Sequence, residues 1–245
     1  LHYQLGDYGN ALERLHAAYE IIKETAPGTR RQASNLIALG SVYREMGNQS
    51  KAQEFLLEAR DVGKVAGDKE IEAAALNNLA AIREKDKDWD GARVMYQQAL
   101  EIARLVGNQS YEIDNLDGLG QVYSATGDHH QAAKVHLEAL SISREIGDRE
   151  GENDALFGIG RGMCLAGLYD EAISWLTDAL ELARKLERRP TLYRTHKLLS
   201  EAFENSGDLK NALHHYREFY RVEKEVFNEE NEERVRRLSV QFELD

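Results

Sequence analysis

Hydrophobic and small residues recur along the chain at helical spacing, in segments of nearly constant length. One segment holds Leu116, Leu119 and Tyr123, and the next holds Ala132 and Ala139. Spacings of three and four residues place these side chains on one face of an α-helix. The pattern therefore predicts helices along the whole chain, each packed through one apolar face.

An alanine returns at intervals of 40 or 41 residues, at Ala11, Ala52, Ala92, Ala132, Ala172 and Ala212. A small residue stands twelve positions before the last five of these, at Gly40, Ala80, Gly120, Gly160 and Ser200. A third small residue follows the first five alanines by seven positions, at Ala18, Ala59, Ala99, Ala139 and Ala179, and the last one has Phe219 there. A fixed period of this length indicates a repeat array, with two helices in each repeat.

Gly-Asp dipeptides mark the ends of the predicted helices. Glycine at the end of a helix adopts the left-handed conformation, and a following Asp accepts hydrogen bonds from the first N–H groups of the next helix. Gly127-Asp128 is expected to separate the two helices of one repeat, and Gly147-Asp148 to separate that repeat from the next. The third repeat has Lys87 in place of the glycine, and Pro190 is expected to begin a helix.

The small positions predict close helix crossings. Only a small side chain leaves room there for a large one on the facing helix. The expected large partners from the second helices are Leu56, Tyr96, Leu176 and Tyr216.

The segment NLDGLGQVYSATGDHHQAAKVHLEAL, residues 115–140, resembles a tetratricopeptide repeat. Its 40-residue period is similar to that of G-protein-signalling modulators and of bacterial Rap-type and transcription-regulator repeats. HEAT and armadillo repeats share the approximate period but lack the three small positions. The resemblance implies an all-α fold, a right-handed superhelical solenoid of about six helix-turn-helix repeats with a long C-terminal helix.

We expect the array to cover residues 1–227, with repeats near 1–27, 28–67, 68–107, 108–147, 148–187 and 188–227. Residues 228–245 are expected to continue as a helix, in which Val235, Leu238 and Phe242 begin a heptad seam. This helix is interpreted either as a cap on the last repeat or as a signalling helix. In the second interpretation it resembles the linker from a bacterial tetratricopeptide sensor to a GGDEF diguanylate cyclase or a histidine kinase. It would then form a homodimer in a longer protein, and the start at Leu1, in mid-pattern, agrees with a longer chain.

Composition narrows the class of partner. The formal charge of −12, from 31 Lys and Arg against 43 Asp and Glu, opposes binding to nucleic acid or to an anionic membrane surface. No apolar run reaches the roughly 20 residues that span a bilayer. The single Cys164 cannot form an internal disulfide, so we expect a cytoplasmic protein.

No motif for catalysis, cofactor binding or metal binding is found. The pairs His129-His130 and His214-His215 lack further ligands at helical spacing, and the glycines are spaced for helix ends rather than clustered around a phosphate. Cys164 is interpreted as a small neutral residue of a groove, and His136, at a core position of its helix, as a buried or half-buried spacer. The sequence therefore predicts neither an enzyme nor a cofactor.

The resemblance places a binding groove on the first helices of the repeats. It implies a peptide-binding set made of Asn77, Asp114, Asp117, Gln121, Asp154, Phe157, Arg161, Arg194 and Lys197. Acidic residues lie in the middle repeats and basic residues follow them, although an ordinary solvated helix face would explain the same pattern.

Two known peptide-binding arrangements do not transfer to this chain. The chaperone carboxylate clamp needs Lys and Arg with paired Asn on successive first helices. The peptide-backbone ladder needs Asn after each small position, where this chain has Ser41, Ala81, Gln121, Arg161 and Glu201. The hypothesis is a non-catalytic scaffold that binds a protein or peptide; the alternative is an N-terminal sensory domain that controls the output domain of a larger bacterial signalling enzyme.

Overall fold

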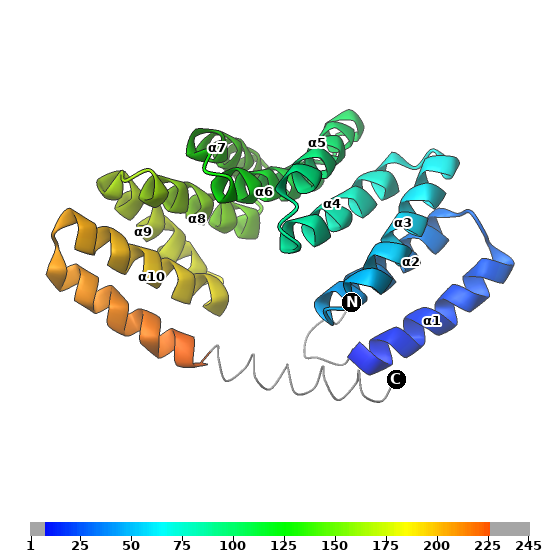
Figure 1. Ribbon diagram of the computed structural model, residues 1–245, viewed down its shortest axis with the longest axis horizontal. Coiled ribbons are helices and arrows are strands. Elements are labelled where there is room, and N and C mark those ends of the chain that lie inside the picture. The colour runs from blue at the N-terminus through cyan, green and yellow to red at the C-terminus, as the bar shows by residue number, and fades with distance from the viewer. Residues whose placement is uncertain (1–7, 226–245) are drawn as a thin grey trace. The chain divides into compact units, whose positions relative to one another are not determined.

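The computed structural model describes residues 8–225, and every regular element in this range is an α-helix (Figure 1). The helices are α1 (Tyr8–Thr25), α2 (Arg30–Glu45), α3 (Gln49–Ala66), α4 (Lys69–Lys85), α5 (Trp89–Val106), α6 (Gln109–Ala125), α7 (His129–Ile146), α8 (Arg149–Leu165), α9 (Tyr169–Lys185) and α10 (Arg189–Ser206). A further helix is described over residues 209–225. The predicted all-α fold is confirmed, whereas residues 228–245 lie outside the described range.

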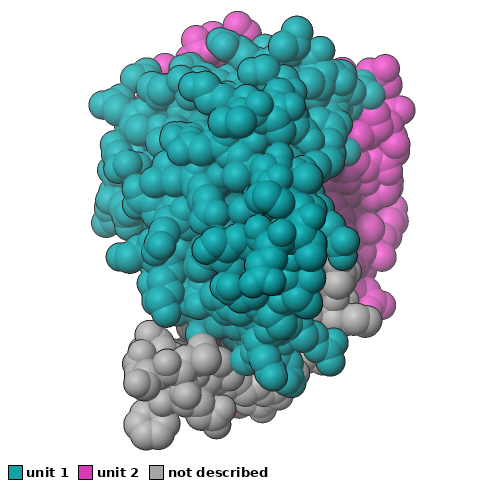
Figure 2. Space-filling model, turned by 90° about the vertical axis from the view of Figure 1, so that its right-hand side faces the viewer, with its two compact units in different colours: residues 1–111, 230–245 teal, residues 112–229 magenta. Residues whose placement is uncertain are grey.

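The chain divides into two compact units (Figure 2). The described part of unit 1 is residues 8–111, and that of unit 2 is residues 112–225. In unit 1 each helix from α1 to α5 packs on the next, and α2 also contacts α4. In unit 2 each helix from α7 to α10 packs on the next, and α8 also contacts α10. First helices therefore contact both their own partners and the first helices of neighbouring repeats, as in stacked helix-pair repeats.

The turns have the predicted chemistry. Gly127, between α6 and α7, has φ +84°, where a residue with a β-carbon is strained. The side chain of Asp128 accepts a hydrogen bond of 3.1 Å from the N–H of Gln131, and its own N–H donates to the carbonyl of Tyr123 at 2.9 Å. Asp148 caps α8 in the same way through the N–H of Gly151.

Three turns depart from this rule: the turns before α5 and α10 lack the glycine, and Leu168 at the N-cap of α9 makes no capping bond with its side chain. Lys87 and Glu187 occupy the left-handed region with φ +60° and +55°, the only residues other than glycine with positive φ in the described chain. Arg188, at the N-cap of α10, makes no capping bond with its side chain. Pro190 lies in the first turn of α10, as predicted. The left-handed Glu187 and the missing cap at Arg188 weaken the turn before α10, because left-handed backbone and a missing cap each cost stability.

The small positions admit large side chains from the facing helix. A β-carbon added to Gly40 would lie 2.6 Å from Cγ of Leu56, and one added to Gly160 would lie 2.6 Å from Cγ of Leu176. Both leucines are fully buried, and Tyr96 is buried in its repeat.

The expectation for Tyr216 is wrong, since this residue is 56% exposed. The helix over residues 209–225 turns His215 inward instead. His215 stacks on Phe203 and shares a hydrogen bond of 2.9 Å with His196, Nδ1 to Nδ1. None of the helices in the described range is long and apolar enough to cross a membrane.

Candidate functional site

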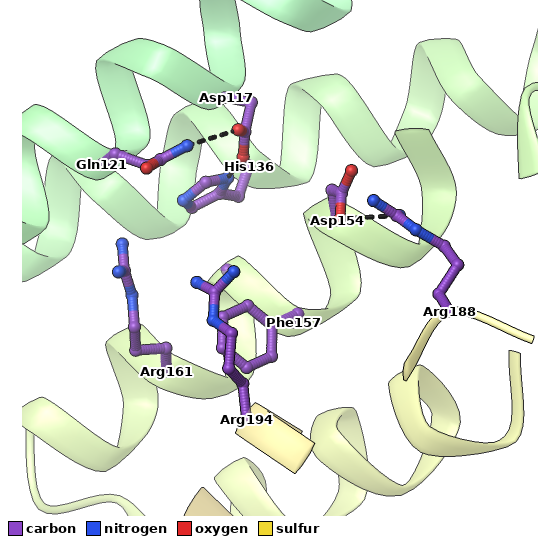
Figure 3. Close-up of a pocket in the computed structure, with 9 residues that line it drawn as sticks. Asp117, Gln121, His136, Asp154, Phe157, Arg161, Arg188 and Arg194 are labelled. Atoms are coloured by element: carbon purple, nitrogen blue, oxygen red, sulfur yellow. Dashed lines mark hydrogen bonds and ion pairs between the residues drawn. The ribbon is translucent and has the colours of Figure 1, made fainter. Parts of the chain in front are cut away.

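A pocket of about 190 Å³ lies within unit 2, and we name it the His136 pocket. Its lining comes mainly from the first helices of three successive repeats. Asp117 and Gln121 belong to α6; Asp154, Phe157, Gly158 and Arg161 to α8; Arg194 to α10; Arg188 to the turn before α10; and His136 to the second helix α7 (Figure 3).

The imidazole of His136 reaches the pocket because glycine stands on both helices that face it. A β-carbon on Gly120 of α6 would lie 2.3 Å from Nε2, and one on Gly158 of α8 would lie 2.5 Å from Cε1. Contacts this short are impossible for real side chains, so His136 fits only between two glycines. The ring is fully buried, as the sequence led us to expect.

Neither ring nitrogen of His136 has a hydrogen-bond partner within the described chain. The nearest carboxylate oxygen is Oδ1 of Asp117, 3.6 Å from Nδ1, which is beyond ordinary hydrogen-bond range. Burial lowers the pKa of His136; the carboxylate of Asp117 opposes this shift and the charge of Arg161 adds to it. The ring is therefore neutral at pH 7, with one donor and one acceptor unused. Buried polar groups in folded proteins seldom lack hydrogen-bond partners.

Carboxylates form one part of the pocket. Asp117 accepts a hydrogen bond of 2.7 Å from the amide of Gln121, and Asp154 pairs with Arg188 at 2.8 Å. Burial raises the pKa of Asp154, although the charge and hydrogen bond of Arg188 oppose this shift. Outside the lining, solvent exclusion and then the charges of neighbouring carboxylates, first Asp117, raise the pKa of Asp114 to about 6.

Guanidinium groups form the other part. The guanidinium of Arg194 lies over the ring of Phe157, 4.5 Å from its centroid, a cation–π geometry that fixes the plane of the group. Figure 3 shows Arg161 and Arg194 pointing from α8 and α10 into the space beside His136. The pocket thus joins a cationic part, an acidic part and a neutral buried imidazole.

Six of the nine residues in the predicted peptide-binding set line this pocket. They are Asp117, Gln121, Asp154, Phe157, Arg161 and Arg194. Asp114 lies near them on α6, and Lys197 is an exposed residue of α10 outside the lining. Asn77 belongs to α4 of unit 1 and is half-buried there.

The peptide-binding set lacked His136, Gly158 and Arg188, and the repeat alignment holds a signal for two of them. The positions equivalent to His136 in the other repeats hold Leu56, Tyr96, Leu176 and Tyr216. The positions equivalent to Arg188 hold Asp68, Asn108 and Asp148. His136 is thus a polar residue at a position that is hydrophobic in other repeats, and Arg188 is a cation at a position that holds a helix cap in other repeats. These two exceptions distinguish this part of the array.

Other reactive groups lie outside the pocket. Burial, with a smaller effect from Glu201, raises the pKa of the Cys164 thiol to about 11, so the nucleophilic thiolate is scarce at pH 7. Within residues 8–225 no group of three His, Cys, Asp or Glu side chains is placed to hold a metal ion.

A helical repeat protein is defined by its paired helices, the small residues at their crossings and the glycine turns between them. Family models identify the type of repeat. One model described as tetratricopeptide repeat matches residues 1–64 and 71–145, and a second model with the same description matches residues 155–190. The chain belongs to the tetratricopeptide repeat family. A search of curated protein sequences found no match.

Solved structures share this fold at low sequence identity. BtubC (BKLC) from P. vanneervenii is 15% identical with a TM-score of 0.77, covering 89% of this chain and 92% of that one. A STAND protein with a tetratricopeptide repeat sensor from Pyrococcus horikoshii is 18% identical with a TM-score of 0.72; the match covers 87% of this chain but 34% of that one. YrrB, whose structure is described as having an unusual peptide-binding site, is 16% identical with a TM-score of 0.55, covering 84% and 93%.

Proposed function

We propose that the chain is a non-catalytic binding module that holds a peptide, or an extended segment of a partner protein, at the His136 pocket. The observation that supports this proposal is that three residues that depart from the repeat pattern lie in the pocket or directly beside it. His136 replaces an apolar core residue, Arg188 replaces a helix cap, and Glu187 replaces a glycine in a left-handed turn.

Each departure costs stability. A buried imidazole without partners forfeits hydrogen bonds, and a left-handed Glu costs about 1–2 kcal/mol. Sequences that break local rules without structural compensation usually do so at functional sites. Here Arg188 lines the pocket and Glu187 directly precedes it, which supports a role in binding.

The size of the pocket supports a peptide rather than an enclosed small molecule. A volume of about 190 Å³ is below the ~300–1,000 Å³ of pockets that surround a whole ligand. It suits one side chain or chain end, with the rest of the ligand lying along the exposed first helices. The peptide-binding site of YrrB shows that a similar fold can serve this role in another protein.

Selection from a displayed library of random heptapeptides tests this proposal. We expect wild-type protein to enrich peptides whose affinity falls by at least about tenfold in Arg194→Ala, since a charge-assisted hydrogen bond contributes about 1.5–3 kcal/mol. Lys185→Ala is the matched control, because Lys185 is an exposed cation near the end of α9 outside the lining. Failure to enrich any peptide, or enrichment indifferent to Arg194→Ala, would contradict the proposal.

A second role is compatible with binding, namely sensory input to a larger signalling protein. It is supported by the likeness to the tetratricopeptide repeat sensor of the STAND protein, of which the match covers a third. Sequencing the gene on both sides of the chain and sedimenting its full product test this role. A downstream cyclase, kinase or ATPase domain together with dimerisation supports it; a full product that carries no output domain and stays monomeric contradicts it.

A further inference from the structure

The helix over residues 209–225, the orange helix that follows α10 in Figure 1, carries an exposed apolar stripe. The stripe is Leu209, Leu213, Tyr216 and Tyr220, whose exposed fractions are 68%, 51%, 56% and 62%. We propose that it binds an amphipathic helix of a partner protein, one with an apolar seam and an acidic row beside that seam. None of the four residues lines the His136 pocket, so this inference goes beyond the proposed function.

The positions of the stripe are covered in the repeats before it. Tyr216 is equivalent to Leu176 and to His136, and both of these residues are fully buried. The first helix of the next repeat closes over His136, since a β-carbon on Gly158 of α8 would lie 2.5 Å from its ring. The stripe is therefore the face on which a further helix would pack, and no helix follows it within residues 8–225.

The spacing within the stripe favours a helical partner. Its four residues follow one another by four, three and four positions, the alternation with which one helix packs its side chains between those of another. Tyr220 stands where Leu180 of the preceding repeat is 4% exposed. A tyrosine keeps its hydroxyl in water while the surface is uncovered and buries its ring when a partner binds, which is typical of interfaces.

A basic row along one side of the stripe selects the charge of the partner. The row is Lys210, Arg217 and Lys224, all exposed. Each lies three or four positions from a residue of the stripe, so the row and the stripe are neighbours on the helix surface. Arg217 and Lys224 have no side-chain hydrogen bond or ion pair within residues 8–225, whereas the nearby Arg221 pairs with Glu218 at 2.8 Å.

The other side of the stripe faces α10 and adds little charge. The carbonyl of Ala212 accepts a hydrogen bond of 3.0 Å from the hydroxyl of Ser200, and the ring of Phe219 lies 6.2 Å from that of Tyr193. The only acidic residue of this helix three or four positions from the stripe is the half-buried Glu223. The surface is therefore net positive in a chain of formal charge −12, and an acidic helix is its electrostatic complement.

Two other occupants fit the stripe less well. In a symmetric antiparallel pair of two copies, the basic row of one copy would face that of the other, and like charges repel. Residues 226–245 do not continue the repeat pattern, because Arg236 and Ser239 stand where α8 has Leu156 and Ile159, which are 2% and 0% exposed. Burying a charge at such a position is costly, which leaves a partner protein as the source of the helix.

Selection from a displayed library of single α-helices tests the proposal. The helices share a seam of apolar residues at heptad spacing, and the positions beside the seam are randomised. We expect the whole chain to enrich helices with Asp or Glu beside the seam. A synthetic peptide of the enriched sequence should bind at least about tenfold more tightly than the same peptide with Lys at those positions.

Paired variants assign the binding to the stripe and its basic row. Leu213→Gln should weaken binding of the acidic peptide at least about tenfold, whereas Leu105→Gln, at an exposed leucine of α5, should leave it unchanged. Arg217→Glu with Lys224→Glu should reverse the preference, so that the Lys peptide binds more tightly. Arg221→Glu is the matched charge control and should leave the preference for the acidic peptide in place.

Several outcomes would overturn the proposal. No enrichment, or enrichment of neutral or basic helices, would exclude an acidic partner helix. Self-association of the chain, or binding to vesicles that contain phosphatidylserine, would identify a second copy or a membrane as the occupant if Leu213→Gln abolished it. Competition by a synthetic peptide of residues 228–245 would identify the chain's own segment. Arg194→Ala, in the His136 pocket, should leave binding of the acidic peptide unchanged, so the inference and the proposed function fail separately.

Discussion

The imidazole of His136 occupies the space that a side chain at Gly120 would need, since a β-carbon there would lie 2.3 Å from Nε2. The same arrangement joins Leu56 to Gly40 and Leu176 to Gly160 in other repeats. The packing rule of the array is therefore kept at His136, while the chemistry of the inserted side chain changes from apolar to polar.

This relationship predicts the cost of a single methyl group. Gly120→Ala should lower the free energy of unfolding by about 1–3 kcal/mol, because the ring of His136 is packed rigidly and cannot move aside cheaply. Gly162→Ala is the matched control, since a β-carbon at this helical glycine meets no atom within 4 Å and should stabilise α8 by about 0.5–1 kcal/mol. Urea unfolding of both variants checks the difference; equal effects would refute the packing account.

The turn at Lys87 predicts a stabilising substitution. Lys87 has φ +60° where the equivalent Gly127 has φ +84°. Lys87→Gly should raise the free energy of unfolding by about 1 kcal/mol, and Gly127→Lys should lower it by a similar amount. Thermal unfolding of the two variants measures both changes, and a fall in stability for Lys87→Gly would show that the turn is not strained.

The pair of His196 and His215 predicts a loss of stability in acid. Burial and the neighbouring imidazole, with Arg184 and His214, lower the pKa of His196 to about 4, against a smaller opposing effect of Glu218. Burial, with His214 and Arg184, lowers that of His215 to about 4. Because the unfolded chain binds more protons between pH 4 and 6.5, the free energy of unfolding should fall as the pH falls through this window, by roughly 2 kcal/mol.

A double variant isolates this effect from other titrating groups. His196→Leu with His215→Met installs residues that occupy the equivalent positions, such as Leu156 and Met95. The difference in unfolding free energy between wild type and variant should change with pH between 4 and 6.5. A difference that stays constant would mean that the histidine pair does not control acid stability.

The turn before α10 predicts an opposition between stability and binding. Arg188→Asn installs the cap found at Asn108 and should stabilise α10 by about 1 kcal/mol. It also removes the 2.8 Å ion pair with Asp154, which is half-exposed and contributes little to stability. Binding of the selected peptides should weaken because the Asp154 carboxylate is then uncompensated; unchanged affinity would place Arg188 outside the site.

The architecture could be predicted from the sequence because each of its rules is local. The 40-residue period, the glycine at a left-handed turn and the Asp after it depend on residues that are close together in the chain. The same local pattern placed Asp117, Asp154 and Arg194 on first helices. A helical period indicates which face a residue occupies, and it was sufficient for these positions.

The residues that line the pocket were harder to predict from the sequence, because the lining depends on where long side chains from different repeats converge. His136 is on a second helix and reaches the pocket only through the two glycines that face it. Arg188 lies in a turn and pairs with Asp154, 34 residues earlier. Lys197 shares a helix with Arg194 yet does not line the pocket, since residues three positions apart on a helix still diverge at the ends of long side chains.

The most direct test of the central claim is one substitution with two readouts. In His136→Leu the free energy of unfolding and the affinity for the selected peptides are measured on the same protein. The account predicts that stability rises by about 1 kcal/mol, because an unsatisfied imidazole is removed, and that peptide affinity falls about tenfold. A stable variant that binds the peptides as tightly as wild type would contradict the claim that His136 belongs to a binding site.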